Sequence, residues 1–411
     1  MNNFQYHNPV RIVFGEGQIR ELSKLVPTDA RVLITYGGGS AKRTGTLDEV
    51  KDALNAEGSK REIFEFGGIE PNPEFTTLMQ AADMVNKHNI DFILAVGGGS
   101  VIDGSKFVAL VSHLTEEDGD TSNSDISQRV SRDKAWDALT SYTKNINSAI
   151  DLGAVLTIPA TGSEMNSGGV INYNERQAKL PFGNPLAYPK FSILDPTKTL
   201  TLPERQVMNG VADAFVHVME QYLTYPVNAK VQDAFAESLL KILITEGRAV
   251  KANPDDLEVR KNIMWTATMA LNGLIGTGVP QDWTTHMIGH ELTSLHGIDH
   301  ARTLTIVLPS LMRELKDSKQ DKLLQYARNV WGISAEDMKD NDEAIEQAIV
   351  RTENFFKELG LPINFADANL DETAIDPIIK QLEAHGMTKL GEHKTNDLEV
   401  SSRILQRAAH A

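Results

Sequence analysis

Up to about residue 196, short apolar runs alternate with amphipathic stretches, and two of the runs end in three glycines. The runs expected to form strands are 31–36, 61–66, 91–96, 154–158 and 191–194. Helix-like stretches such as 46–55 and 74–88 lie between them. Strand, glycine turn and helix in repetition are typical of a parallel sheet covered by helices. The pattern therefore predicts an α/β domain over residues 1–196.

From about Thr201 the pattern changes to long stretches with apolar residues at spacings of three and four, which is the periodicity of helices. The expected helices are 203–223, 231–251, 256–274, 283–295, 300–316 and 342–359. Thr201 and Pro203 fit the start of the first helix, and Gly360 fits the end of the last. No clear strand interrupts them, so residues 197–411 are predicted to form an all-helical domain.

Composition narrows the class of protein. A chain of 411 residues, 41% hydrophobic and 23% charged, is typical of a soluble protein with two domains. Its net charge of −16 argues against binding nucleic acid or an anionic membrane. No apolar run is long enough to span a membrane, and the N-terminus lacks a signal-peptide pattern, so we expect a cytoplasmic protein. The acidic, serine-rich segment 115–133 is predicted to be an exposed insertion of loop or weak helix.

A glycine cluster, Gly97–Asp103 (GGGSVID), follows a strong strand and opens a helix. Backbone N–H groups at such a turn can approach a phosphate, and the start of the helix favours negative charge. The cluster is not a G-x-G-x-x-G motif, because Ile102 occupies the third glycine position, and a sharp turn needed only for backbone geometry remains the alternative. The segment 159–166 (PATGSEMN) also follows a strand and could let a cofactor ring lie close to the backbone.

The other glycine cluster, which is the first along the chain, follows the run 31–36 and carries positive charge. Enzymes that prefer NAD commonly place an acid where it can bond the ribose hydroxyls. Here no acid stands between the glycines and Asp48. A hydroxyl and two cations follow the glycines instead and suit a 2′-phosphate, which favours NADP(H). An ordinary solvated basic turn is the alternative. The residues concerned are Gly37, Gly38, Gly39, Ser40, Lys42 and Arg43.

One carboxylate and three imidazoles form the candidate metal site in a chain without cysteine. Asp213 and His217 stand four positions apart, so on a helix they share one face. His286 and His300 follow later in the chain. Zn²⁺ or Fe²⁺ would accept this set of nitrogen and oxygen ligands, and the lack of thiolates favours a catalytic site. The alternative is that each histidine packs or caps independently.

Two further histidines, His290 and His296, lie between His286 and His300. His286 and His290 are four positions apart, yet Met287 stands where a zinc protease needs glutamate. Ser294 stands where a motif begun at His290 would need its second histidine. A metalloprotease is therefore a poor fit, and His290 and His296 become candidates for proton transfer or substrate contact.

Taken together, these motifs resemble the iron-containing (group III) alcohol dehydrogenases, most closely their NADPH-dependent aldehyde reductase or butanol dehydrogenase branch. The resemblance extends over nearly the whole chain. It implies a Rossmann-like domain followed by a helical metal-binding domain, the dehydroquinate synthase-like fold, with the site in the cleft between them. The matching stretches are FGGIEPNP, AVGGGSVIDGSKF, PATGSE, LDPTKTLTLPERQVMNGVADAFVHVMEQY and LNGLIGTGVPQDWTTHMIGHELTSLHGIDHA.

The resemblance also implies roles for particular residues. One divalent metal, Fe²⁺ or Zn²⁺, would be bound by Asp213, His217, His286 and His300. At the position of Gly37 many NAD-using relatives have aspartate, so its absence favours NADP(H) further. Cofactor contacts are implied for Gly97, Gly98, Gly99, Ser100 and Asp103 near the pyrophosphate, and for Thr157, Thr161, Ser163 and Lys179.

The expected reaction is reduction of short- to medium-chain aldehydes to primary alcohols, catalysed by a homodimer. The nicotinamide carries the hydride, the metal polarises the carbonyl, and a proton comes from His290, a ribose hydroxyl or solvent. Glycerol dehydrogenases and dehydroquinate synthases are related alternatives. The first uses fewer histidine ligands and the second needs basic residues around a phosphorylated substrate. A metal-dependent scaffold or regulator without enzymatic activity is the alternative from another class.

Overall fold

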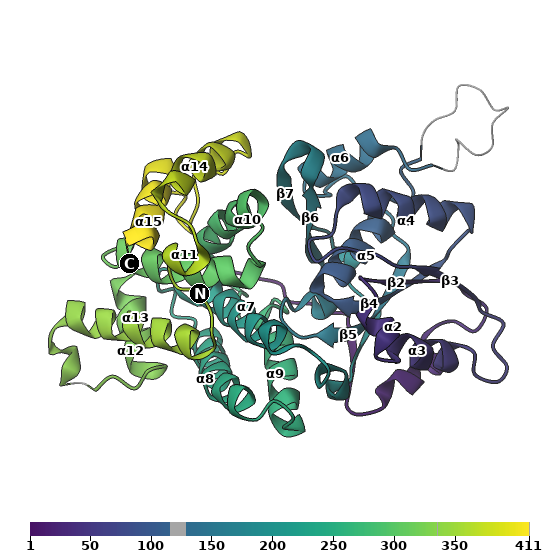
Figure 1. Ribbon diagram of the computed structural model, residues 1–411, viewed down its shortest axis with the longest axis horizontal. Helices are drawn as coiled ribbons and strands as arrows, with labels where there is room; N and C mark the ends of the chain where they lie inside the picture. The colour runs from purple at the N-terminus through teal and green to yellow at the C-terminus, as the bar shows by residue number, and fades with distance from the viewer. Residues whose placement is uncertain (116–128, 335, 411) are drawn as a thin grey trace. The chain divides into compact units, whose positions relative to one another are not determined.

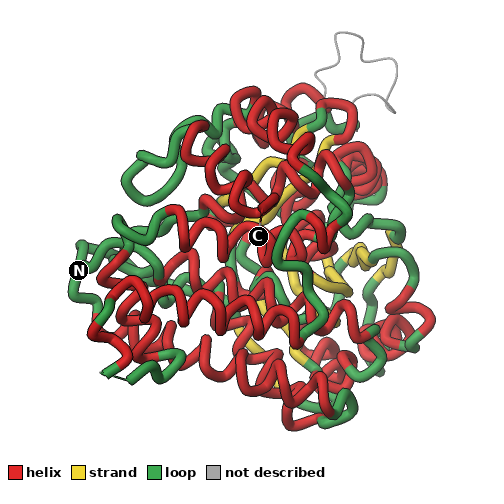
Figure 2. The backbone as a smooth tube through the Cα atoms, turned by 60° about the vertical axis from the view of Figure 1, so that its left-hand side comes forward, coloured by secondary structure: helices red, strands yellow, loops and turns green. Residues whose placement is uncertain are grey.

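A computed structural model of the chain describes residues 1–115, 129–334 and 336–410. The chain divides into two compact units, Asn8–Leu202 and a second unit in which Met1–His7 join Pro203–Ala411. Among the described residues every strand belongs to the first unit. Figure 2 draws the strands in yellow and the helices in red.

The first unit is built on a six-stranded sheet in the order β1-β8-β5-β4-β2-β3. All its neighbouring strands are parallel, so each connection must cross over the sheet, usually through a helix. The strands are β1 (Arg11–Phe14), β2 (Arg31–Tyr36), β3 (Glu62–Phe66), β4 (Phe92–Gly98), β5 (Asp151–Ile158) and β8 (Phe191–Leu194).

Helices cover both faces of this sheet (Figure 1). Successive side chains of a strand point to opposite faces. Val32 and Ile34 of β2 therefore enter one core with α1 (Leu22–Leu25) and α3 (Thr46–Leu54). Thr35 points to the other face, where its hydroxyl lies 2.6 Å from Ser105 of α5. The remaining helices of the unit are α2 (Ser40–Arg43), α4 (Phe75–Lys87), α5 (Gly99–Val111) and α6 (Arg132–Thr140).

The five strands and the two helices predicted for this half are confirmed, with ends that shift by up to three residues. The sequence reading missed β1 and an antiparallel hairpin formed by β6 (Gly168–Tyr173) and β7 (Ala178–Gly183). Of the predicted insertion 115–133, residues 116–128 lie outside the described residues. Thr115 and Val130 on either side form an antiparallel bridge.

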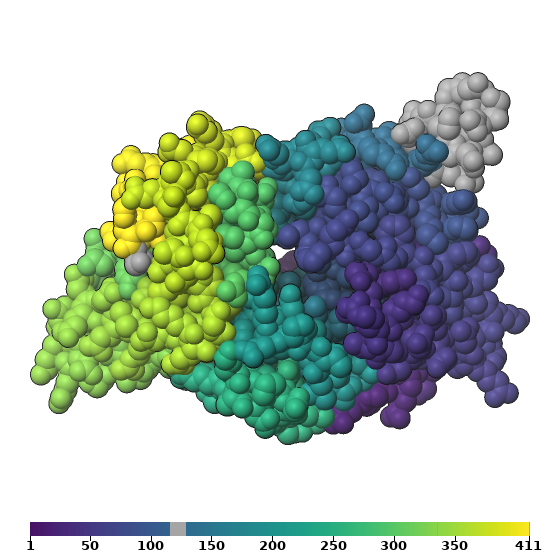
Figure 3. Space-filling view, viewed as in Figure 1, coloured from purple at the N-terminus to yellow at the C-terminus, as the bar shows by residue number. Residues whose placement is uncertain are grey.

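The second unit is helical in its described residues, apart from one isolated bridge. The six predicted helices are confirmed, and α12, α14 and α15 follow in addition. In the space-filling view the last two form the yellow-green and yellow surface of this unit (Figure 3). The helices are α7 (Glu204–Tyr222), α8 (Lys230–Ala252), α9 (Leu257–Ala270), α10 (Thr284–His296), α11 (His300–Glu314), α12 (Gln320–Asn329), α13 (Asn341–Glu358), α14 (Ile375–Ala384) and α15 (Leu398–His410).

Helix α7 lies at the centre of this unit, and every residue from Val207 to Tyr222 is buried. It packs against α8, α9 and α11. The ends of the surrounding helices follow local chemistry. Asp256 accepts hydrogen bonds from the first amides of α9, and Gly360, with φ +74°, follows α13 in the left-handed conformation that glycine tolerates. Among the described residues, no helix has both the length and the hydrophobicity that crossing a membrane requires.

Candidate active site

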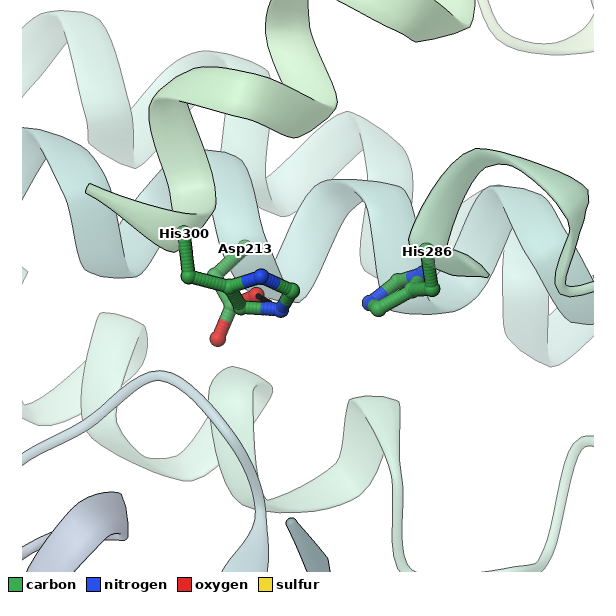
Figure 4. Close-up of side chains that lie close together, drawn as sticks. All are labelled: Asp213, His286 and His300. Atoms are coloured by element: carbon green, nitrogen blue, oxygen red, sulfur yellow. Dashed lines mark ion pairs between the residues drawn. The ribbon is translucent and has the colours of Figure 1, made fainter. Parts of the chain in front are cut away.

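Three neighbouring helices supply the candidate metal ligands. Asp213 and His217 lie one turn apart on α7, His286 lies in the first turn of α10, and His300 is the first residue of α11. Single ligand atoms of Asp213, His286 and His300 all lie within 4.8 Å of one another. Figure 4 shows the imidazole of His286 directed toward the other two side chains.

His217 joins this group from the same face of α7 as Asp213. Its Nε2 lies 3.8 Å from Asp213 Oδ1, and its ring stacks on that of His286 with centroids 4.8 Å apart. His300 Nε2 approaches the same carboxylate oxygen at 3.7 Å. The structure therefore brings the four predicted ligands together around one buried carboxylate.

This arrangement fits a divalent cation. Asp213 is only 3% exposed, and its Oδ1 has no hydrogen-bond partner among the described residues. A buried carboxylate oxygen left unpaired is costly, whereas a cation would satisfy it. Two ligand atoms on one tetrahedral ion, each about 2.1 Å from it, lie roughly 3.4 Å apart. The separations of 3.7 and 3.8 Å from Asp213 to its two imidazoles are slightly wider than this.

His290 lies one turn after His286 on α10 and is also buried. Its ring centroid is 5.1 Å from that of His300 and 6.3 Å from that of His286. It is therefore next to the candidate ligands but outside the group of three. His296 is the last residue of α10 and is exposed, where burial of part of its ring lowers its pKa.

Sequence reasoning missed one residue of this site, Glu220. It lies on α7 one turn after His217, and its Oε1 accepts from the His286 amide at 2.9 Å and lies 3.1 Å from His286 Nδ1. Burial and then the charge of Asp282 raise the pKa of Glu220, while the amides of His286 and Trp283 and the charge of Lys319 lower it. The spacing H-x-x-E on a helix was the available signal, but it does not tell a buried acid from a solvated one.

In the first unit, the glycine clusters lie at the carboxyl ends of adjacent strands. In the register of β2 and β4, Tyr36 pairs with Val96, so Gly37, just after β2, and Gly97 and Gly98, the last residues of β4, lie side by side on one edge of the sheet. The chain leaves β2 for β3 on one side and returns to β4 on the other. Such a point of reversal is where open α/β sheets bind ligands.

In the second cluster, glycine is required because a side chain would not fit, and not because the backbone is left-handed. None of Gly97, Gly98 and Gly99 has a positive φ. A Cβ on Gly97 would lie 2.6 Å from Val101 Cγ2, and one on Gly99 would lie 2.3 Å from Thr161 Oγ1. The turn thus packs closely against its own helix and against the loop that follows β5, and side chains are excluded there.

Several predicted cofactor residues bond to one another. Asp103 accepts from the Ser163 hydroxyl through Oδ1 and from the Val170 amide at 3.0 Å through Oδ2. Thr161 Oγ1 accepts from the Ser163 amide at 3.2 Å. Asp103, Thr161 and Ser163 therefore hold the loop 159–166 against α5, an arrangement that shapes the edge whether or not they touch a cofactor.

The other predicted cofactor residues lie around the same edge or near it. Ser100 donates to the carbonyl of Pro71, and Lys179 on β7 donates to Asn72 Oδ1 at 3.0 Å. Thr157 lies next to the last residue of β5 and is half-buried. The exposed or half-buried residues of the first cluster are Gly37, Gly38, Gly39, Ser40, Lys42 and Arg43.

A buried lysine that sequence reasoning missed, Lys106, joins α5 to the hairpin. Its Nζ donates to Ser163 Oγ at 2.9 Å, to Asn166 Oδ1 at 2.9 Å and to the carbonyl of Gly168 at 2.8 Å. Burial lowers its pKa to about 8, although the charges of Asp103 and Glu164 act in the opposite direction. Lysine is rarely buried without partners. The three acceptors show that the fold provides hydrogen-bond partners for this buried ammonium group.

The burial of Lys106 can be tested by measuring how its replacement changes the pH dependence of stability. The unfolded chain keeps the proton of Lys106 up to about its ordinary pKa of 10.5, but the folded chain keeps it only to about 8. Stability conferred by the lysine should therefore rise with pH between these values, by about 3 kcal/mol in total. We expect the difference in unfolding free energy between wild type and Lys106→Met to grow by that amount in urea titrations from pH 7.5 to 10.5. A difference independent of pH would contradict a buried, charged Lys106.

Comparison with known proteins places this architecture in one family. Residues 9–196 match the family described as iron-containing alcohol dehydrogenase, and residues 206–398 match the C-terminal part described for the Fe-containing alcohol dehydrogenase family. Together these matches cover most of both units. The chain belongs to the iron-containing alcohol dehydrogenase family, and the resemblance found in its motifs is confirmed.

Individual relatives agree over the full length. The chain is 52% identical over 408 residues to the NADPH-dependent aldehyde reductase YqhD of Escherichia coli K12, covering 99% of this chain and 100% of that protein. A crystal structure of that E. coli protein superposes with a TM-score of 0.91, at 51% identity and 99% coverage of both chains. The NADH-dependent butanol dehydrogenase A of Thermotoga maritima superposes with a TM-score of 0.89, at 32% identity over 100% of this chain and 99% of that one. The predicted fold class is confirmed by these structures.

Proposed function

We propose that the protein is a metal-dependent, NADP(H)-linked alcohol dehydrogenase that mainly reduces short- to medium-chain aldehydes to primary alcohols. The observation that carries this proposal is the buried Asp213 carboxylate with His286 and His300 within 4.8 Å, in a chain of this family. The 52% identity to an NADPH-dependent aldehyde reductase supports the direction and the cofactor. The ligand set, including His217, is part of the proposal.

The chemistry divides between bound groups and the protein. A divalent cation would polarise the aldehyde carbonyl, and the nicotinamide would supply the hydride. Asp213, His217, His286 and His300 would hold the cation, and the burial of Asp213, His217 and His286 would limit the competition of water for it. His290, with its ring 5.1 Å from that of His300, donates the proton that the substrate oxygen gains.

For the cofactor, we assign residues 1–196 to dinucleotide binding and residues 197–411 to metal binding and catalysis. The glycine turns at the reversal point between β2 and β4 would approach the phosphates, as ligands do at such edges. The contacts proposed from the loop after β5 and from β7 are those of Thr157, Thr161, Ser163 and Lys179, together with Asp103 on α5. The proposal further includes a homodimer in the cytoplasm, and either Fe²⁺ or Zn²⁺ as the metal.

The test is elemental analysis of protein purified without chelator, combined with assays of the same sample on a panel of short aldehydes. We expect about one equivalent of Fe or Zn per chain and faster oxidation of NADPH than of NADH. In the same assays His290→Ala should retain its metal and turn over more slowly. Absence of aldehyde-dependent oxidation of either cofactor by metal-loaded protein would overturn the proposal and favour a scaffold or regulator.

A further inference from the structure

Glu220 connects the two helices that carry most of the candidate metal ligands. On α7 it stands seven positions after Asp213 and three after His217, a spacing that places the three side chains along one helix face. It is only 3% exposed. From this position it reaches His286 of α10 twice, through the backbone amide at 2.9 Å and through the ring Nδ1 at 3.1 Å.

The bond to the amide replaces an ordinary helix cap. Helix α10 begins after Trp283, whose side chain gives no capping hydrogen bond. The amides of the first turn need acceptors from outside the helix, and the amide of the third residue, His286, is the one that a capping side chain commonly satisfies. Here the acceptor comes from α7 instead. The backbone position of His286 is therefore set relative to the helix that carries Asp213.

The bond to the ring selects a tautomer. When Glu220 is ionised, its oxygen has no proton to give to Nδ1, so the bond then requires the proton to be on Nδ1. The lone pair of the neutral ring then lies on Nε2, the nitrogen left to bind a metal. A carboxylate behind a histidine ligand serves this purpose at many metal sites.

We propose that Glu220 is a positioning residue of the metal centre, which fixes both the backbone and the metal-binding tautomer of His286. The inference rests on the proposed function, because it takes His286 to be a ligand. A purely structural role is the competing explanation. Glu220 also accepts the Asp282 amide on its backbone carbonyl at 2.9 Å, and Asp282 pairs with the buried Lys319 at 2.9 Å.

Substitution Glu220→Gln separates the two roles. Glutamine keeps the shape and an oxygen that can accept from the His286 amide and from Nδ1, but it lacks the negative charge that holds the proton on Nδ1 and makes Nε2 more basic. We expect the dissociation constant for Zn²⁺, measured by competition with a chromophoric chelator, to rise by about 10- to 100-fold. In protein loaded with Co²⁺, we also expect the visible absorption spectrum to change, because the orientation of one ligand is released.

The matched control is Glu237→Gln. Glu237 is a buried acid of the same unit whose Oε1 accepts from Tyr222, Gln325 and Asn329. The substitution removes the same charge from a carboxylate that likewise accepts several hydrogen bonds. It should lower the thermal stability of the protein but leave the Zn²⁺ dissociation constant and the Co²⁺ spectrum as in wild type.

The outcomes distinguish this inference from the proposed function. If Glu220→Gln binds Zn²⁺ within threefold of wild type, Glu220 has only a structural role and the inference is wrong. If Glu220→Gln does not fold, Glu220→Asp, whose shorter side chain cannot reach both nitrogens of His286, is judged by the same threefold limit. If His286→Ala binds Zn²⁺ as tightly as wild type, it is the proposed ligand set that fails, whatever the result at Glu220.

Discussion

Replacing Asp213 by asparagine, or His286 by alanine, should abolish metal retention and lower aldehyde reduction by about a thousandfold or more. Asp213 Oδ1 lies within 3.8 Å of two imidazole nitrogens. Because the other three ligands are imidazoles, the charge of Asp213 is the only negative one in the ligand set. The metal is expected to stabilise the charge that develops on the substrate oxygen by several kcal/mol. Losing about 4 kcal/mol of that stabilisation corresponds to the thousandfold decrease.

Metal content by elemental analysis and turnover with NADPH give the primary measurements. Thermal unfolding adds a second, because a ligand that binds only the folded state raises its stability by about 4 kcal/mol at a thousand times its dissociation constant. Added Zn²⁺ should therefore stabilise wild-type protein that has been stripped of metal, but neither variant. In the same unit, the exposed His393, which stacks on Tyr225 at 4.5 Å, provides the control variant His393→Ala. A metal-free variant with full turnover would show that the site has been assigned wrongly.

How much of this fold the sequence predicts depends on how clear the hydrophobic pattern of each element is. The central strands β2 and β4 could be predicted because both faces of a parallel sheet are covered, which gives continuous apolar runs. The edge strand β1 has only four residues, none of them buried, so its pattern is weak. In the hairpin of β6 and β7, Val170 pairs with Pro181. Proline and the flanking glycines argue against a strand wherever no partner is known.

In the candidate site, too, only the part that depends on local sequence could be predicted. Asp213 and His217 could be paired from their spacing alone, because both lie on one helix. Their association with His286 and His300 depends on the packing of α7, α10 and α11, for which the sequence offers only the choice of residue types. Glu220 and Lys106 were missed because acids and lysines on helices are usually solvated, and only their burial and their partners reveal them.

The cofactor preference leads to the second prediction with a large effect. Neutralising both cations after the first glycine cluster, in the double variant Lys42→Gln/Arg43→Gln, should raise the KM for NADPH by about 30-fold and leave that for NADH unchanged. A Cβ on Gly39 would lie 3.5 Å from Arg43 Nη1, so the guanidinium folds back over the turn at the end of β2. Two exposed cations that bond a 2′-phosphate contribute together about 2 kcal/mol, which corresponds to the 30-fold change.

Steady-state kinetics with both cofactors, at low and at high salt, measure this effect. Screening should weaken the preference of wild type for NADPH and change the variant less. The control is Lys24→Gln/Lys60→Gln, which removes the same charge from two exposed positions, with Lys60 shortly before the amino end of β3, at the opposite edge of the sheet. If the variant at Lys42 and Arg43 loses NADPH and NADH affinity equally, or neither, these residues form an ordinary solvated turn. Discrimination between the cofactors must then come from the missing aspartate at Gly37, where a Cβ would already lie 3.2 Å from the carbonyl oxygen of Ile69.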